Sequence, residues 1–250
     1  MSEESYIAVD LHIHTALSPC ASAELTPLNV VKHAKKSGLN AIAITDHNSS
    51  LNVLAAIEAG KKYNLTVIPG MEVETIEGVH VLTLFENMNL LSQFNKIIEA
   101  LLPNISNNTE VFGYQTIFSK NNRVMGEYPK LLAQSAQITL EKVVNIVLSL
   151  GGVPIPSHIY RKANGIISVL GFIPPNLCVS TLEVHKANYN LANIEESLIS
   201  HYNIVVNSDA HCIQDLYTEP FTALKVTDCS PKCILSKLKS KQNFDEVVVV

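Results

Sequence analysis

The chain contains no long hydrophobic run. Although 47% of its 250 residues are apolar, no stretch approaches the roughly 18 consecutive apolar residues that a membrane-spanning helix requires. The segment from Met1 to Ser5 is acidic and polar, unlike a secretory leader. We therefore expect a soluble cytoplasmic protein that has no membrane partner.

Basic side chains and cysteines are also scarce. Lysine and arginine total 18 against 23 acidic residues, which gives a net charge of −5 and a pI near 6.0. Such a chain lacks the basic stripe typical of sequence-independent nucleic-acid binding, and this favours a small or short anionic substrate. The five cysteines are odd in number and scattered, so they suit a reducing compartment better than a disulfide framework.

Apolar runs typical of strands alternate with amphipathic runs typical of helices along almost the whole chain. This alternation favours an α/β fold built from βα units around a parallel sheet or barrel. Thr26 and Thr139 are expected to cap two of the helices. No repeat or Pro/Gly linker divides the sequence, which predicts one domain over 1–250 with a polar insertion at about 103–130. The expected strands are 7–9, 40–45, 65–69, 79–85, 153–157, 181–184, 204–207, 222–226 and 247–250.

Polar clusters lie at or just beyond the ends of five expected strands. Because the carboxyl ends of parallel strands converge, these clusters are expected to surround one pocket. His12 and His14 lie two residues apart, so an extended strand directs both side chains to the same side. His80 begins its strand instead, and it reaches the pocket if residues 76–78 form a turn that pairs it with Glu74. The clustered residues are His12, His14, Asp46, His47, Glu72, His158, Asp209 and His211.

Imidazole and carboxylate groups in this combination favour Zn²⁺, Mn²⁺ or Fe²⁺. Glu72 can bridge two such ions, and a metal-bound or bridging water becomes a nucleophile near neutral pH. No protein nucleophile is then needed, in agreement with the absence of a Gly-x-Ser-x-Gly motif and of a phosphate-binding P-loop. Asp46, directly before His47, is expected to orient a ligand by hydrogen bonding.

Taken in order, these motifs resemble those of the polymerase and histidinol phosphatase (PHP) family, in particular its stand-alone bacterial members. The motifs span residues 10–211. The resemblance implies a distorted (βα)7 TIM-like barrel, two or three divalent metal ions (Zn, Mn or Fe) and the hydrolysis of phosphate esters. The matching segments are His12-Ile13-His14, Thr45-Asp46-His47, Pro156-Ser157-His158 and Ser208-Asp209-Ala210-His211, with Glu72 and His80 between them.

The resemblance also implies a set of metal ligands. Many relatives have a further histidine six residues after the second histidine of the first motif, where this chain has Cys20. A thiolate is a good ligand for zinc or iron, so Cys20 either replaces that histidine or weakens the third site. The implied ligands are His12, His14, Glu72 and Asp209 for one ion, Glu72, His80 and His158 for a second, and His47 and His211 for a third.

Two further residues are candidates for catalysis. Arg161 follows His158 by three residues and can form a bidentate contact with a substrate phosphate, the alternative being an exposed loop arginine. His185 shares a strand face with Glu183 and can protonate the leaving group, the alternative being a hydrogen-bonded barrel histidine. The expected substrate is a small phosphorylated molecule or a nucleotide, with a short oligonucleotide as a further option.

Three functional hypotheses follow. The first is a metal-dependent phosphoesterase, in which a metal-bridging hydroxide attacks a phosphomonoester or a phosphodiester. The second is an amidohydrolase-type enzyme for C–N or C–O bonds, which also begins with His-x-His but has no Thr-Asp-His ligand on its second strand, so that His47 distinguishes the two. The third is a non-catalytic, metal-binding regulatory domain, a hypothesis that the cysteine at position 20 keeps open.

Overall fold

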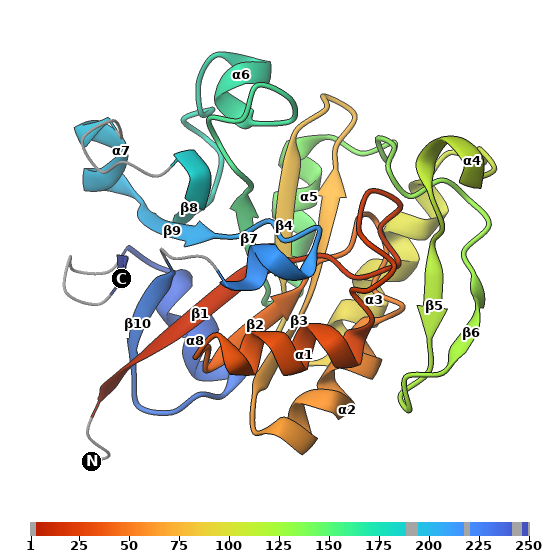
Figure 1. Cartoon of the computed structure of the whole chain (residues 1–250). Coiled ribbons are helices and arrows are strands. Elements are labelled where there is room, and N and C mark those ends of the chain that lie inside the picture. The colour runs from red at the N-terminus through yellow and green to blue at the C-terminus, as the bar shows by residue number, and fades with distance from the viewer. Residues whose placement is uncertain (1–3, 189–194, 218–220, 242–246, 250) are drawn as a thin grey trace.

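The computed structural model describes residues 4–188, 195–217, 221–241 and 247–249 (Figure 1). Its centre is a mixed seven-stranded sheet in the order β11-β10-β1-β2-β3-β4-β7. The strands of this sheet are β1 (Ser5–Ile13), β2 (Ala41–Ile44), β3 (Thr66–Glu74), β4 (His80–Leu84), β7 (Val153–Pro156), β10 (Thr222–Val226) and β11 (Val247–Val249).

The sheet is curled, and two further strands lie between its two ends. Strands β8 (Thr181–His185) and β9 (Asn203–Asn207) form a separate parallel pair, in which β8 contacts β7 and β9 contacts β1. Backbone hydrogen bonds join the two sheets: Ile159 N donates to Glu183 O (2.9 Å), His14 N donates to Ala210 O (3.1 Å), and Ala210 N donates to His12 O (3.3 Å). The described strands thus form an α/β half-barrel, while a complete (βα)7 barrel stays a prediction.

The strands are not uniformly parallel. β1, β2 and β3 run parallel, whereas β4 is antiparallel to both β3 and β7. A tight turn reverses the chain after β3: Thr75 N donates to Val79 O, and Gly78 has a φ of 81°, which glycine adopts readily. The resulting register pairs Glu74 with His80, which confirms the turn expected at residues 76–78.

Helices cover the sheet, and the two expected caps are confirmed. The Thr26 hydroxyl accepts from Asn29 N (3.3 Å) and the Thr139 hydroxyl from Lys142 N (3.4 Å), which satisfies amides that the first turn leaves free. The helices are α1 (Pro27–Lys36), α2 (Val53–Tyr63), α3 (Met88–Leu101), α4 (Thr109–Phe112), α5 (Leu140–Ser149), α6 (Ile166–Leu170), α7 (Glu196–His201) and α8 (Pro231–Leu238), with short 3₁₀ turns η1 (Lys186–Asn188) and η3 (Ile213–Tyr217).

The sheet has one apolar layer on each face. On one face, α1, α2, α3 and α5 pack against side chains such as Ile42 and Met71. On the other face, Ile68 and Leu82 pack in a layer to which α8 contributes Ile234. Side chains alternate along a strand, so residues that lie two or four positions from Ile68 on β3 point to the α8 face as well. This alternation places Glu72 on the α8 face of the sheet.

The segment 103–130, expected to be a polar insertion, contains α4 and a hairpin of β5 (Thr116–Phe118) and β6 (Val124–Glu127) that lies at one side of the molecule (Figure 1). Buried Gln115 holds the two ends of the hairpin together by donating to Tyr128 O and Lys130 O and accepting from Leu132 N. The single domain and the insertion stay predictions. No helix in the described residues is long and apolar enough to cross a membrane.

Candidate metal centre

An irregularity in β1 directs its two histidines into the fold. The pairing with β2 shifts by one residue between Asp10 and Ile13, as in a β-bulge. Before the shift, Val9 packs in the α8 layer; after it, Ile13 packs in the opposite layer. The extra residue reverses the alternation, so His12 and His14 turn to the α8 face with their Nε2 atoms 3.1 Å apart.

The carboxylate of Glu72 lies at the centre of the cluster. Glu72 is completely buried on β3, and each of five imidazoles places a ring nitrogen within 3.4 Å of one of its oxygens. The histidines come from β1, the loop after β2, β4 and the loop after β7, so the curled sheet brings distant segments together. Their distances to Glu72 are 3.3 Å for His12, 3.4 Å for His14, 3.1 Å for His47, 3.0 Å for His80 and 3.3 Å for His158.

Asp209 supplies a second buried carboxylate beside the β1 histidines. Its Oδ1 lies 3.1 Å from His12 Nε2 and 3.2 Å from His14 Nε2, while its Oδ2 accepts from Arg161 (2.9 Å). Asp209 and His158 have φ values of 50° and 30°, in the left-handed region that non-glycine residues seldom adopt. Such backbone strain concentrates at functional sites, where the surrounding fold holds a side chain in a required direction.

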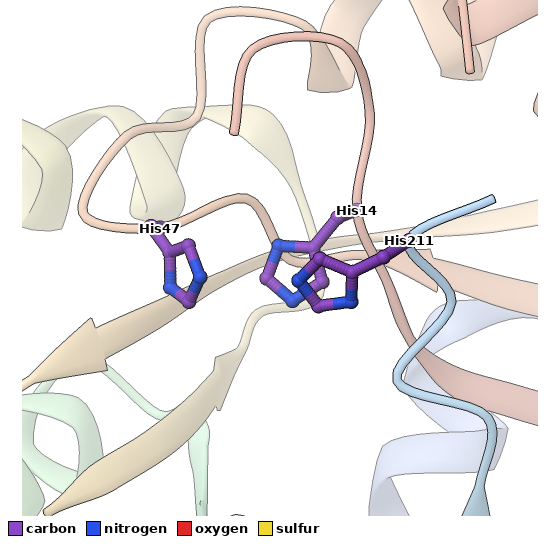
Figure 2. Close-up of side chains that lie close together, drawn as sticks. All are labelled: His14, His47 and His211. Atoms are coloured by element: carbon purple, nitrogen blue, oxygen red, sulfur yellow. The ribbon is translucent and has the colours of Figure 1, made fainter. Parts of the chain in front are cut away.

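Three overlapping groups of side chains have the spacing that a metal ion requires. Figure 2 shows one of these groups, formed by His14, His47 and His211. Its rings come from the end of β1, from the loop after β2 and from the loop after β9. The ring centroids of its members lie 4.2 to 6.2 Å apart. The groups are His12, His14, Glu72 and Asp209; His47, Glu72 and His80; and His14, His47 and His211.

This arrangement matches the implied ligand set for the first ion. The second group contains Glu72 and His80 as expected, but it adds His47; His158 falls outside it, although its Nε2 lies 3.3 Å from Glu72. The third group contains His47 and His211 and adds His14. The structure therefore brings every implied histidine and carboxylate ligand together, while their role as ligands stays a prediction.

Several buried atoms in the cluster have no hydrogen-bond partner. His47 Nδ1, for example, lies 3.1 Å from Glu72 Oε2, yet the pair lacks hydrogen-bond geometry. An unsatisfied buried polar group costs about 1–3 kcal/mol, and divalent cations would satisfy these atoms at once. The donor set therefore fits a metal centre. The unpartnered atoms are His47 Nδ1, Glu72 Oε2, His80 Nε2, both ring nitrogens of His158, and Asp209 Oδ1.

Charge attraction dominates the electrostatics of the cluster. Burial alone would raise the pKa of Glu72, but His80 and His12 outweigh it and hold this pKa well below its usual range. In the same way burial would lower the pKa of His80, but Glu72 raises it to about 9. Without cations, Glu72 thus stays charged beside a protonated His80, and a cation must displace that proton to bind His80.

Two residues that orient the histidines, Glu183 and Ser18, were not predicted from the sequence. Both oxygens of Glu183, buried in β8, lie 3.0 Å from His12 Nδ1, which fixes the ring and leaves Nε2 for a cation. The Ser18 hydroxyl lies 2.9 Å from His14 Nδ1 and donates to Asp46 (2.7 Å). Asp46 thus orients His14 through Ser18. A carboxylate inside an apolar strand was the available signal for Glu183.

The remaining candidate residues lie around the cluster. Cys20 is exposed, with its Sγ 3.1 Å from His211 Nε2, and it lines an open pocket together with His47, His80, Arg161 and His211. The Arg161 side chain is 45% exposed, and its guanidinium contacts Asp209. His185 is half-buried on β8, and its Nδ1 accepts from Ala187 N at 3.1 Å.

The fold and the site define a class: an α/β half-barrel with a buried histidine and carboxylate cluster that could hold metal ions. The PHP domain family matches residues 10–152, more than half of the chain. The chain therefore belongs to the PHP domain family.

Known proteins with similar sequence or structure include longer ones. The PolC-type DNA polymerase III of Caldanaerobacter subterraneus subsp. tengcongensis is 26% identical over 197 residues, which cover 78% of this chain and 13% of the polymerase. The lesion-specific endonuclease EndoQ of Pyrococcus furiosus matches 94% of this chain with a TM-score of 0.69 and 20% identity. A second endonuclease Q structure, with a 27-mer duplex whose abasic lesion lies at the active site, matches with a TM-score of 0.66.

An amidohydrolase of Chromobacterium violaceum matches 82% of this chain and 88% of its own, with a TM-score of 0.54 and 18% identity. At this identity, the solved structures establish the shared fold alone. The chain spans only 56% of the P. furiosus endonuclease, and its alignment covers a still smaller share of the polymerase.

Proposed function

We propose that the protein is a metal-dependent phosphoesterase that hydrolyses a phosphomonoester or a phosphodiester. The observation that carries this proposal is the arrangement of five imidazoles around the buried Glu72 carboxylate, with further acceptors on Asp209. A shared carboxylate of this kind is suited to hold two cations close together, as two-metal phosphoesterases require. Membership of the PHP domain family supports the same conclusion.

Each ligand set would then hold one cation. His12, His14 and Asp209 would bind the first, His80 and His158 the second, and Glu72 would bridge the two. When bound, the cations supply a nucleophilic water near neutral pH and offset negative charge on the phosphate. Glu183 keeps the His12 ring in place, so that Nε2 stays directed at the first position.

Arg161 and His185 are proposed to act on the substrate. One terminal nitrogen of Arg161 donates a hydrogen bond to Asp209, and the guanidinium has further donors for phosphate oxygens. His185 Nδ1 accepts a backbone hydrogen bond, which leaves Nε2 as the nitrogen that can hand a proton to the leaving group.

Cys20 is proposed as a ligand of a third cation, together with His47 and His211. The 3.1 Å separation between Cys20 Sγ and His211 Nε2 supports this assignment. The buried His47 Nδ1, which has no hydrogen-bond partner, supports it as well. A thiolate at this position would favour zinc or iron over magnesium.

The proposed substrate is a small phosphorylated molecule, a nucleotide or a short oligonucleotide. The endonuclease and polymerase relatives support a nucleotide component. The net charge of −5 favours short substrates over long duplexes, because it supplies no extended basic surface.

The amidohydrolase neighbour keeps one alternative open, namely hydrolysis of a C–N or C–O bond. His47 favours the phosphoesterase, because it follows the second strand and lies 3.1 Å from Glu72. If His47→Ala lowers both metal content and phosphoesterase turnover, the alternative is disfavoured. An unchanged metal content in His47→Ala would favour the amidohydrolase.

The test measures metal content and turnover on the same samples, purified without chelator and assayed with an aryl phosphate, an aryl phosphodiester and a nucleotide panel. We expect two or three metals per chain, and loss of both metal and turnover in His12→Ala. His201→Ala, which removes an exposed histidine of α7, is the matched control and should behave as wild type. Metal-loaded wild type that hydrolyses none of these esters would support the regulatory alternative and contradict the proposal.

A further inference from the structure

Exposed apolar side chains gather on the segment 103–130. Burial of an aromatic ring stabilises the folded protein. Two aromatic rings that stay exposed on a folded segment therefore suggest a binding role. Phe112 is 44% exposed and Tyr114 is 61% exposed, one on either side of Gly113. The exposed aliphatic neighbours are Ile105, Val111, Val124 and Met125.

The backbone that carries the two rings is held firmly against the metal centre's own loop. Gly113 has a φ of 93°, and a Cβ on it would lie 2.5 Å from the carbonyl oxygen of Pro19. Asn107 donates to Gly113 O (2.9 Å), and Thr116 N donates to Ala16 O (2.7 Å). Only glycine permits so close an approach, so the contact between this segment and the loop after β1 is built into the sequence.

This contact brings the backbone of residues 112–114 close to the edge of the pocket. Pro19 precedes Cys20, which lines the pocket and lies 3.1 Å from His211. Consecutive Cα atoms are about 3.8 Å apart, so the Cα atoms of Phe112 and Tyr114 lie on the order of 10 Å from that of Cys20. A base attached to a phosphate in the pocket is within reach of an aromatic side chain at that separation.

We propose that Phe112 and Tyr114 bind the planar base of a nucleotide substrate whose phosphate occupies the metal centre. This proposal rests on the proposed phosphoesterase function and narrows its substrate class. Aromatic side chains bind bases by stacking, which needs no net positive charge, and this suits a chain of net charge −5. The base can belong to a mononucleotide or to the end of a short oligonucleotide.

The test compares esters with and without a base. The monoester pair is adenosine 5′-monophosphate and ribose 5-phosphate; the diester pair is thymidine 5′-(4-nitrophenyl) phosphate and methyl 4-nitrophenyl phosphate. In the double variant Phe112→Ala/Tyr114→Ala we expect KM for the base-containing ester to rise roughly tenfold, the usual scale of one lost stacking contact. Turnover of the base-free ester should not change, which also shows that the variant is folded.

Two controls separate stacking from a general loss of structure. Tyr114→Phe retains the ring and should keep the preference for the base. Met125→Ala removes another exposed apolar side chain from the same segment, on β6, and should also behave as wild type. If only the diester pair responds to the double variant, the base belongs to an oligonucleotide; if the monoester pair responds, it belongs to a mononucleotide.

Binding of a fluorescent adenine nucleotide to metal-loaded protein, followed by anisotropy, keeps the test independent of turnover. If wild type hydrolyses no ester but the double variant binds this nucleotide about tenfold more weakly, the phosphoesterase function fails and the base site stands. If the double variant matches wild type in KM and in binding, the base site is wrong. If that variant instead loses self-association while its nucleotide kinetics stay unchanged, Phe112 and Tyr114 form a contact between protein chains, and the proposal is overturned.

Discussion

At the residue scale, the site depends on charges that the fold has removed from water. Glu72 and Asp209 are both buried, and although burial would raise their pKa values, the nearby imidazoles hold both pKa values below their usual range. His12 links them, since its Nε2 lies 3.3 Å from Glu72 and 3.1 Å from Asp209. Its Nδ1 contacts a third carboxylate, that of Glu183. The orientation of this single ring therefore governs how well the first cation position is formed.

Glu183→Gln is the sharpest test of that dependence. The amide keeps the size of the side chain but removes the negative charge that holds His12 Nδ1, so we expect metal affinity to fall about 10- to 100-fold with the fold intact. Competition with a metal chelator measures the affinity, and circular dichroism measures the fold. Glu141→Gln, on the exposed first turn of α5, should leave the affinity unchanged. Equal affinities in wild type and Glu183→Gln would show that His12 needs no such partner.

At the element scale, a small number of polar side chains hold the segment 103–130 together and attach it to the body. Gln115 is completely buried and forms three hydrogen bonds, to Tyr128, Lys130 and Leu132. Asn52, in turn, accepts from Phe118 N and donates to Thr116 O across the other edge of β5. The segment is thus fixed by directional contacts that a single substitution can remove.

Gln115→Ala leaves two carbonyls and one amide without partners. We expect the free energy of unfolding to fall by about 1–3 kcal/mol, with faster hydrogen exchange in β5 and β6 than in the central sheet. Denaturant unfolding and hydrogen exchange measure the two effects. Gln93→Ala, on the exposed face of α3, is the matched control. Uniformly faster exchange across the sheet would indicate that the segment and the body unfold as one unit.

The same scale explains which elements could be predicted from the sequence. The helix caps at Thr26 and Thr139 and the turn before His80 depend on neighbouring residues, and the structure confirms all three. The bulge in β1 depends on pairing with β2, and nothing local marks it. β1 extends from Ser5 to Ile13, so it contains the expected 7–9 strand and continues towards the histidine pair as expected, whereas its register shift was not anticipated. The hairpin within 103–130 was missed because its strands are short and β6 is fully exposed.

At the scale of the whole molecule, the convergence of distant residues follows from one topological rule. His14, His47 and Asp209 each lie just beyond the end of a strand, Glu72 lies two residues before the end of β3, and parallel strands end at a common edge. Their proximity could therefore be anticipated from the sequence. Which histidine joins which group depends on the positions of the side chains, and here the structure differs from the expectation, because His47 joins the second group and His158 falls outside it.

Removing metal should destabilise the whole chain. Without cations the centre holds buried carboxylates and imidazoles with several unpartnered atoms, and cations that bind only the folded state stabilise it by mass action. At free metal a hundredfold above Kd this amounts to about 2.7 kcal/mol, or roughly 5–10 °C in Tm for a chain of this size. Calorimetry of metal-loaded and chelator-treated protein measures the shift. The shift should largely disappear in Glu72→Gln and persist in His201→Ala, and an unchanged Tm after verified metal removal would mean that the folded cluster needs no cation.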